Sequence, residues 1–310
     1  MRVEVRIKNH RSCVLDQGPE IDEYWTMMNE IREIAKCTKL AKFAKLTQVG
    51  AYATSGFDAS AVPIRACVFV AGFFAATISL PCAGAARLQD LKPAMKVGNF
   101  AVRHLLLDAD QQVLGAEFFH RQSGAQVFVL QYESVPQVFQ WVDTPPFDDR
   151  GLPHSLEHLL AGKGSTGRSS YLLENMLLGI EANATFYDYT MYPLLSRSGL
   201  DNFFRLFSAK LRALLAPDFS DAEAEREFYH FAVQRDPNGK LSLIEKGSVY
   251  NEMVNTNHRH DHFFAIYRMV LGEKNPLGYS WGGDPNAMRT GESAKIVFSQ
   301  VICRASASPT

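Results

Sequence analysis

The five residues His154-Ser155-Leu156-Glu157-His158 are the side chains in this sequence best suited to chemistry. Residues four apart lie on the same face of a helix, so His154 and His158 can direct imidazole nitrogens at one zinc ion. Two histidines leave two positions of a tetrahedral zinc shell, one for a third protein ligand and one for water. Glu157 is close enough to act as general base toward that water. The alternative from these five residues alone is a surface helix with two histidines on one stripe.

Motifs on both sides of this segment occur in a recognisable order. T-P-P begins at Thr144, G-x-P-H-x-x-E-H at Gly151, V-Y-N-E-M at Val249 and G-G-D-P at Gly282. Together they resemble the pitrilysin and insulin-degrading enzyme family of zinc peptidases, and most of all its presequence-protease branch. The resemblance covers about residues 98–290. It implies an α+β fold in which helices pack on one face of an antiparallel-rich sheet, here apparently truncated.

The resemblance also implies a role for individual residues. His154 and His158 are zinc ligands, Glu157 is the general base, and Glu252 in V-Y-N-E-M is the third ligand of a single Zn²⁺ per chain. The family has a second glutamate seven residues before its glutamate ligand, which is Glu245 here. That carboxylate could orient a ligand histidine from outside the metal shell. An ordinary solvated carboxylate is the alternative reading of Glu245.

The segment from Asn183 to Pro193 resembles the strand on which the family binds an extended peptide. Backbone hydrogen bonds along a strand hold a peptide without reading much of its sequence. We therefore expect Asn183, Ala184 and Thr185 to bind substrate. The family usually has phenylalanine or methionine after Asn-Ala, where this chain has Thr185. A plain amphipathic strand is the alternative.

The function implied by the resemblance is that of a zinc-dependent endopeptidase, acting on peptides or unfolded segments. Family enzymes enclose the substrate between two halves, each built of repeated α+β domains, and the later half helps to stabilise the intermediate. The alternative is a catalytically incomplete fragment, or a non-catalytic half of the same fold that serves in binding or assembly. The expected partners are a peptide substrate and a complementary second half or homologous subunit. Without such a partner we expect the chain to hydrolyse peptides poorly.

Composition excludes some classes of function. The chain of 310 residues is 46% hydrophobic and 21% charged, with a formal net charge of −1, so it can bury a sizeable core and has no basic excess for nucleic acid. Its five cysteines are scattered and odd in number, which argues against a disulfide framework and against a cysteine-zinc site.

The sequence divides into four segments. Residues 1–61 form an N-terminal extension of doubtful status, residues 62–86 resemble a signal peptide, residues 87–290 form the peptidase domain, and residues 291–310 are a divergent tail. The apolar run Ala66–Leu80 precedes Ala83-Gly84-Ala85, which fits a cleavage site for export to the periplasm or the extracellular space. A mature chain would then begin near Ala86, and residues 1–61 would reflect a misassigned start. A buried core helix and a membrane anchor are the alternatives.

Hydrophobic periodicity predicts the elements that must position the site. Strands are expected at 112–120, 125–131 and 138–142, followed by a loop rich in breakers at 143–153. Helices are expected at 170–178, 200–215 and 221–234, and a further helix from about Leu243 would carry both Glu245 and Glu252.

Overall fold

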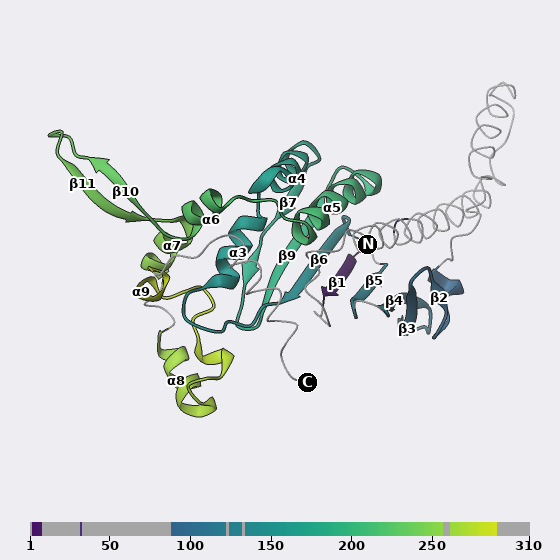
Figure 1. The fold of residues 1–310 in the computed structure, drawn as a ribbon. Helices are drawn as coiled ribbons and strands as arrows, with labels where there is room; N and C mark the ends of the chain where they lie inside the picture. The colour runs from purple at the N-terminus through teal and green to yellow at the C-terminus, as the bar shows by residue number, and fades with distance from the viewer. Residues whose placement is uncertain are drawn as a thin grey trace, which may run out of the picture.

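The computed structural model describes residues 2–7, 32, 88–121, 124–131, 134–256 and 261–289. The signal-like segment 62–86 and the tail 291–310 lie outside these residues. Strands and helices mix in an α+β arrangement, as predicted, with α3, α4 and α5 over one face of the main sheet (Figure 1). Within the described ranges no helix is long and apolar enough to cross a membrane.

Nine strands of the described chain form the main sheet, in the order β2-β3-β4-β5-β1-β6-β9-β7, with β8 also paired to β9. Every pairing is antiparallel except that of β1 with β6. The strands predicted around residues 112–142 are confirmed as β4, β5 and β6. The strand bounds are β1 (Arg2–Ile7), β2 (Lys96–Val97), β3 (Phe100–Leu107), β4 (Val113–His120), β5 (Gln126–Leu130), β6 (Gln137–Asp143), β7 (Gly179–Glu181), β8 (Ala184–Thr185) and β9 (Tyr189–Ser196).

The first residues of the chain occupy an interior position in this sheet. β1 lies between β5 and β6, so that Arg2 is opposite Leu130 on one side and Gln137 on the other. Its backbone pairs antiparallel with β5 and parallel with β6. Although residues 1–61 carry no family motif, their first strand therefore joins the two parts of the sheet in this structure (Figure 1).

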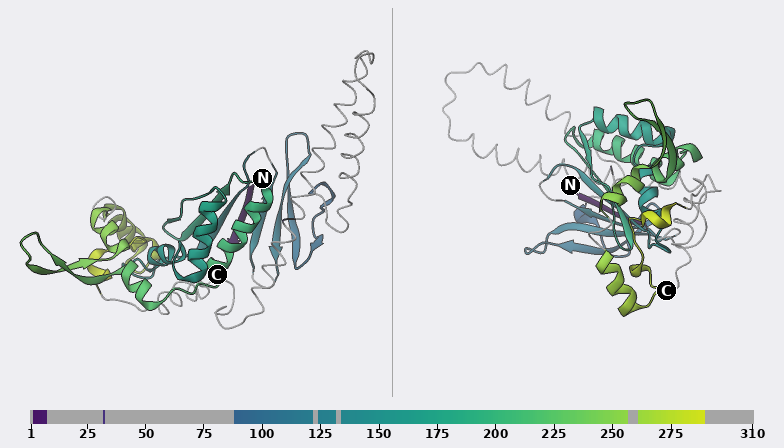
Figure 2. Two further views of the ribbon diagram at one scale, coloured as in Figure 1. Left: turned by 90° about the horizontal axis from the view of Figure 1, so that it is seen from above. Right: turned by 90° about the vertical axis from the view of Figure 1, so that its left-hand side faces the viewer.

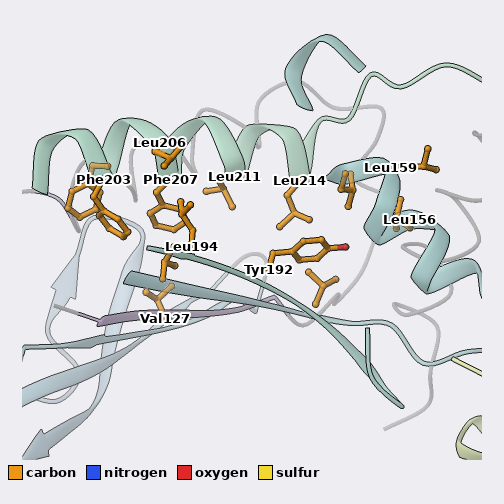
Figure 3. Close-up of a cluster of buried hydrophobic side chains, with 14 of the residues drawn as sticks. Val127, Leu156, Leu159, Tyr192, Leu194, Phe203, Leu206, Phe207, Leu211 and Leu214 are labelled. Carbon is orange, nitrogen blue, oxygen red and sulfur yellow. The ribbon is translucent and has the colours of Figure 1, made fainter. Parts of the chain in front are cut away.

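The helix predicted at residues 200–215 is confirmed as α5. Its apolar stripe lies over the sheet, with Phe203, Phe207 and Leu214 buried above β5 and β9 (Figure 3). Burial of this stripe contributes about 25 cal/mol of stabilising free energy per Å² of apolar surface removed from water. The helix bounds are α3 (Leu152–Leu160), α4 (Gly164–Met176), α5 (Leu200–Leu215), α6 (Asp221–Phe228), α7 (Ser248–Thr256), α8 (Asp261–Leu271) and α9 (Pro285–Met288), with short 3-10 turns η2 (Leu88–Asp90) and η4 (Pro276–Gly278).

The predicted helices at 221–234 and from about Leu243 are wrong in part. α6 ends at Phe228, and β10 (His230–Arg235) and β11 (Leu241–Lys246) form an antiparallel hairpin instead. Apolar residues alternate on both sides of the turn at 236–239, which is the period of a strand. The hairpin projects away from the main sheet (Figures 1 and 2). α4 also begins at Gly164, earlier than predicted.

Candidate metal centre

The helix α3 holds both histidines of the H-x-x-E-H segment on one face. The rings of His154 and His158 are edge to face, with centroids 4.8 Å apart. The helix starts after Gly151, whose φ of 68° lies in the left-handed region that favours glycine, and it has a proline in its first turn. Local sequence thus fixes where α3 begins and which side chains share its face.

Glu252 reaches the histidines from α7, a helix that is distant in the sequence. One of its carboxylate oxygens, Oε2, lies 3.7 Å from His154 Nε2 and 3.4 Å from His158 Nε2. One ligand atom from each of these three residues can be chosen so that all lie within 4.8 Å of one another. Two imidazole nitrogens and one carboxylate oxygen are a donor set typical of catalytic zinc, so the residues present fit this metal. They line a cavity of about 460 Å³.

The orientation of His154 depends on the G-G-D-P segment. Its Nδ1 lies 3.0 Å from the carbonyl oxygen of Gly282, so an N–H there donates to this oxygen and Nε2 faces Glu252. A Cβ on Gly151 would lie 2.4 Å from the same oxygen, so only glycine permits this close approach. The loop that precedes α3 is also joined to the segment before G-G-D-P through Asp149, which accepts hydrogen bonds from Arg268 and from the Ser280 backbone N–H. This packing gives G-G-D-P a structural role beside His154.

Glu227 is a site residue that sequence reasoning missed. It lies near the end of α6, only 7% exposed, with Oε2 3.6 Å from His158 Nδ1 and Oε1 2.7 Å from Lys163 Nζ. The carboxylate therefore faces the side of His158 that is turned away from Glu252. A signal was present in the sequence, because Glu227 shares a helix face with the apolar residues Ala224 and Phe228, which are also buried.

The three carboxylates around His158 change its protonation. Burial lowers the pKa of His158, but hydrogen bonding to Glu227 and Glu252 and the nearby charge of Glu157 outweigh this effect and raise it to about 9. Burial raises the pKa of Glu227. The hydrogen bonds to His158, Lys163 and Ser248 outweigh this effect and lower the pKa to about 2. The pKa of Glu252 is lowered mainly by its hydrogen bond to His158. A cluster with this charge attracts a cation, and metal binding would displace the proton from His158.

Glu157 and the predicted substrate strand lie on the same cavity. Asn183, Ala184 and Thr185 line it together with Glu157. The Thr185 hydroxyl donates a hydrogen bond to Glu157 Oε2 at 2.6 Å, a contact that the sequence did not predict. The side-chain oxygen of Asn183 is buried and has no hydrogen-bond partner among the described residues. This stretch therefore presents both a group that contacts the candidate base and an unused polar atom.

Glu245 lies apart from the histidines. It is in the strand β11 rather than on the helix of Glu252, and Gly247, with φ of 150°, separates the two elements. Its carboxylate accepts hydrogen bonds from Tyr229, Tyr250 and Arg289. Across the described ranges, no hydrogen bond or ion pair joins Glu245 to either histidine. The expectation that one helix carries both Glu245 and Glu252 is wrong, because the strand β11 occupies residues where a helix was predicted.

Comparison with known proteins gives a consistent set of relatives. Presequence protease 1, chloroplastic/mitochondrial, of Arabidopsis thaliana is 32% identical over 176 residues, which are 54% of this chain and 16% of that protein. The mitochondrial presequence protease of Eremothecium gossypii is 28% identical over 198 residues, which are 60% of this chain and 19% of that protein. That of Danio rerio is 29% identical over 163 residues, 51% of this chain and 16% of that protein. No protein-family model matches the chain.

These relatives overturn one expectation. They are named mitochondrial or chloroplastic, so the prediction of export to the periplasm or extracellular space, together with its signal peptide, is wrong. An apolar run followed by small residues was a weak basis for it, because position near the N-terminus, which a signal requires, was missing. The matches span less than a fifth of the relatives' own length, 16% to 19%. Over about half of its sequence, this chain has presequence proteases of the pitrilysin and insulinase family as its homologues.

Proposed function

We propose that this chain is the metal-binding part of a zinc-dependent endopeptidase that acts on peptides or unfolded segments. One observation carries the proposal: His154, His158 and Glu252 bring ligand atoms within 4.8 Å of one another, and Glu157 lies on the same cavity. The relatives named presequence proteases support the same reaction class. Their names also support action inside mitochondria or plastids, on peptides in that compartment.

The mechanism assigns each residue a task. Zinc held by His154, His158 and Glu252 would act as a Lewis acid on the scissile carbonyl and make water more acidic. Glu157 takes a proton from the attacking water as the water oxygen bonds to the carbonyl carbon. It then gives that proton to the amide nitrogen as the carbon–nitrogen bond breaks. The Gly282 carbonyl orients the His154 imidazole, and Glu227 orients that of His158, each by contacting the Nδ1 atom of the ring.

The strand β8 is the proposed binding edge for the substrate backbone. In the described residues it pairs with β9 on one side, and its residues line the cavity on the other. An extended peptide added to this edge would pass beside Glu157. The Asn183 side-chain oxygen, which has no partner among the described residues, supports the proposal as an acceptor that a substrate N–H could use.

Paired variants of the base test the catalytic role. Glu157→Gln keeps all three ligands, so zinc content measured by metal analysis should stay at one per chain. Cleavage of a fluorescence-quenched peptide should fall by about 10²–10⁴ because the proton acceptor is lost. His158→Ala should lose both zinc and cleavage. Equal cleavage by wild type and Glu157→Gln would refute the catalytic proposal, and full zinc content in His158→Ala would refute the metal site.

A second candidate function is binding or assembly without catalysis. The observation that favours it is an exposed apolar face on the hairpin β10–β11, where the strand register puts four side chains on one side. These are Phe231, Val233, Leu241 and Leu243. Such a face is typical of a surface that another protein part covers. Zinc binding without peptide cleavage, alone or with a complementary half, would favour this second function.

A further inference from the structure

Three threonine hydroxyls form a row that ends on Glu157. The Thr144 and Thr190 hydroxyl oxygens are 2.7 Å apart, and those of Thr190 and Thr185 are 3.3 Å apart. Thr185 then donates to Glu157 Oε2 at 2.6 Å. Thr190 and Thr185 are paired residues of β9 and β8, and Thr144, which follows β6, is the threonine of the T-P-P segment.

The row has a defined direction. A hydroxyl has one proton to donate, and the Thr185 proton is directed at a carboxylate that can only accept. The Thr185 oxygen is then left to accept from Thr190, and the Thr190 oxygen to accept from Thr144. Thr144 and Thr190 are 2% and 0% exposed, so water does not compete for these bonds. Hydrogen bonds linked in this way strengthen one another in a medium of low dielectric constant.

We propose that the Thr144–Thr190–Thr185 row positions the carboxylate of Glu157, and that Thr185 is a positioning residue for the base. The inference rests on the proposed function. Thr185 fixes Oε2, which leaves the other carboxylate oxygen of Glu157 for the attacking water. The side chain of Thr185 thus has a role that is separate from the backbone pairing expected of β8 with substrate.

The consequence for catalysis is selective. A base displaced by about 1 Å loses much of its effect, whereas ground-state binding of a peptide to the β8 backbone does not require it. Thr185→Val has nearly the same shape and removes the hydroxyl. We expect it to lower kcat about tenfold to hundredfold, the range for losing one hydrogen bond to a charged group, with KM unchanged. Thr185→Ser keeps the hydroxyl and should restore most of kcat.

An assay without turnover gives a second measurement. A peptide hydroxamate binds zinc and also hydrogen-bonds to a neighbouring carboxylate, so its affinity reports the position of Glu157. In the zinc-loaded full chain, Thr185→Val should weaken hydroxamate binding about tenfold, while the zinc dissociation constant stays unchanged. Thr190→Val, one step further along the row, should have a smaller effect. In a Glu157→Ala background Thr185→Val should have none, because a double-mutant cycle isolates the contact between the two residues.

The outcomes separate this inference from the proposed function. Zinc and hydroxamate binding in the wild type, with no loss in Thr185→Val, would overturn the row but leave the metal site intact. An equal loss in the Glu157→Ala background, or a Thr185→Ser variant as weak as Thr185→Val, would also overturn it. A wild type that binds neither zinc nor hydroxamate would refute the proposed function itself, and the positioning role with it.

Discussion

Replacing Glu227 by glutamine should weaken zinc binding by about 10–100-fold without removing a ligand. Glu227 faces Nδ1 of His158 at 3.6 Å, while Nε2 of the same ring faces Glu252. A carboxylate in this position favours the tautomer with a proton on Nδ1, which leaves Nε2 free to bind metal, and it makes the imidazole a stronger donor. Glutamine has nearly the same volume but loses the charge.

The size of the effect follows from the burial of the pair. Glu227 is 7% exposed, so solvent screens its interaction with His158 only weakly. A 10–100-fold loss corresponds to about 1.4–2.7 kcal/mol of binding free energy. The same change leaves Lys163 without its carboxylate partner at 2.7 Å, so stability must be measured separately by thermal unfolding of the metal-free proteins.

The assay is competition for zinc against a chromophoric chelator at one fixed pH. Glu245→Gln is the matched control, because Glu245 is also a glutamate with several hydrogen bonds, but its partners are Tyr229, Tyr250 and Arg289. We expect the zinc dissociation constant of Glu245→Gln to equal that of the wild type. The reasoning is refuted if Glu227→Gln binds zinc as tightly as the wild type. It is also refuted if only Glu245→Gln binds zinc more weakly, as the family resemblance alone would suggest.

Three other perturbations test the fold around the site. Gly151→Ala should lower stability by more than about 2 kcal/mol, since its Cβ would lie 2.4 Å from a backbone oxygen. The control Gly199→Ala has a similar positive φ but open space around the new Cβ, so it should cost only about 1 kcal/mol. Equal melting temperatures of the two variants would contradict this reasoning. Burial and the charge of Glu181 raise the pKa of Glu174 to about 7, so its contribution to stability is full below about pH 4.5 and is lost as pH rises through 7. Glu174→Gln should therefore flatten the fall in the free energy of unfolding between pH 5 and 8, by about 2 kcal/mol at pH 8, and an unchanged pH profile would count against it. Deleting residues 2–7 removes β1 from between β5 and β6 and should lower stability by at least about 2 kcal/mol in chemical denaturation, which an unaltered unfolding midpoint would disprove.

The elements that depend on nearby residues were predictable from the sequence. The stripe of α5 and the strands β4, β5 and β6 follow from periods of 3.6 and 2 residues, which need only a short window of sequence. The shared face of His154 and His158 is of the same kind, because helix geometry alone sets it. The alternation of Phe231 and Val233 also encodes β10 of the hairpin locally, but the helix predicted at 221–234 covered most of this strand.

The assembly of the site was decided by tertiary structure. Glu252 was expected as the third ligand from a family resemblance, since no local rule relates residues on two helices that are far apart in the chain. Glu227 beside His158, and the Gly282 carbonyl beside His154, depend on how α6 and the G-G-D-P loop pack against α3.

The threonine row shows the same division between sequence and structure. Thr144, Thr185 and Thr190 are ordinary residues of a loop and two strands until strand pairing stacks their hydroxyls behind Glu157. The physical reason is that covalent geometry fixes the direction of side chains within one element. Contacts between elements arise only when their apolar faces are buried together, and the sequence specifies that burial through the whole core rather than through any one segment.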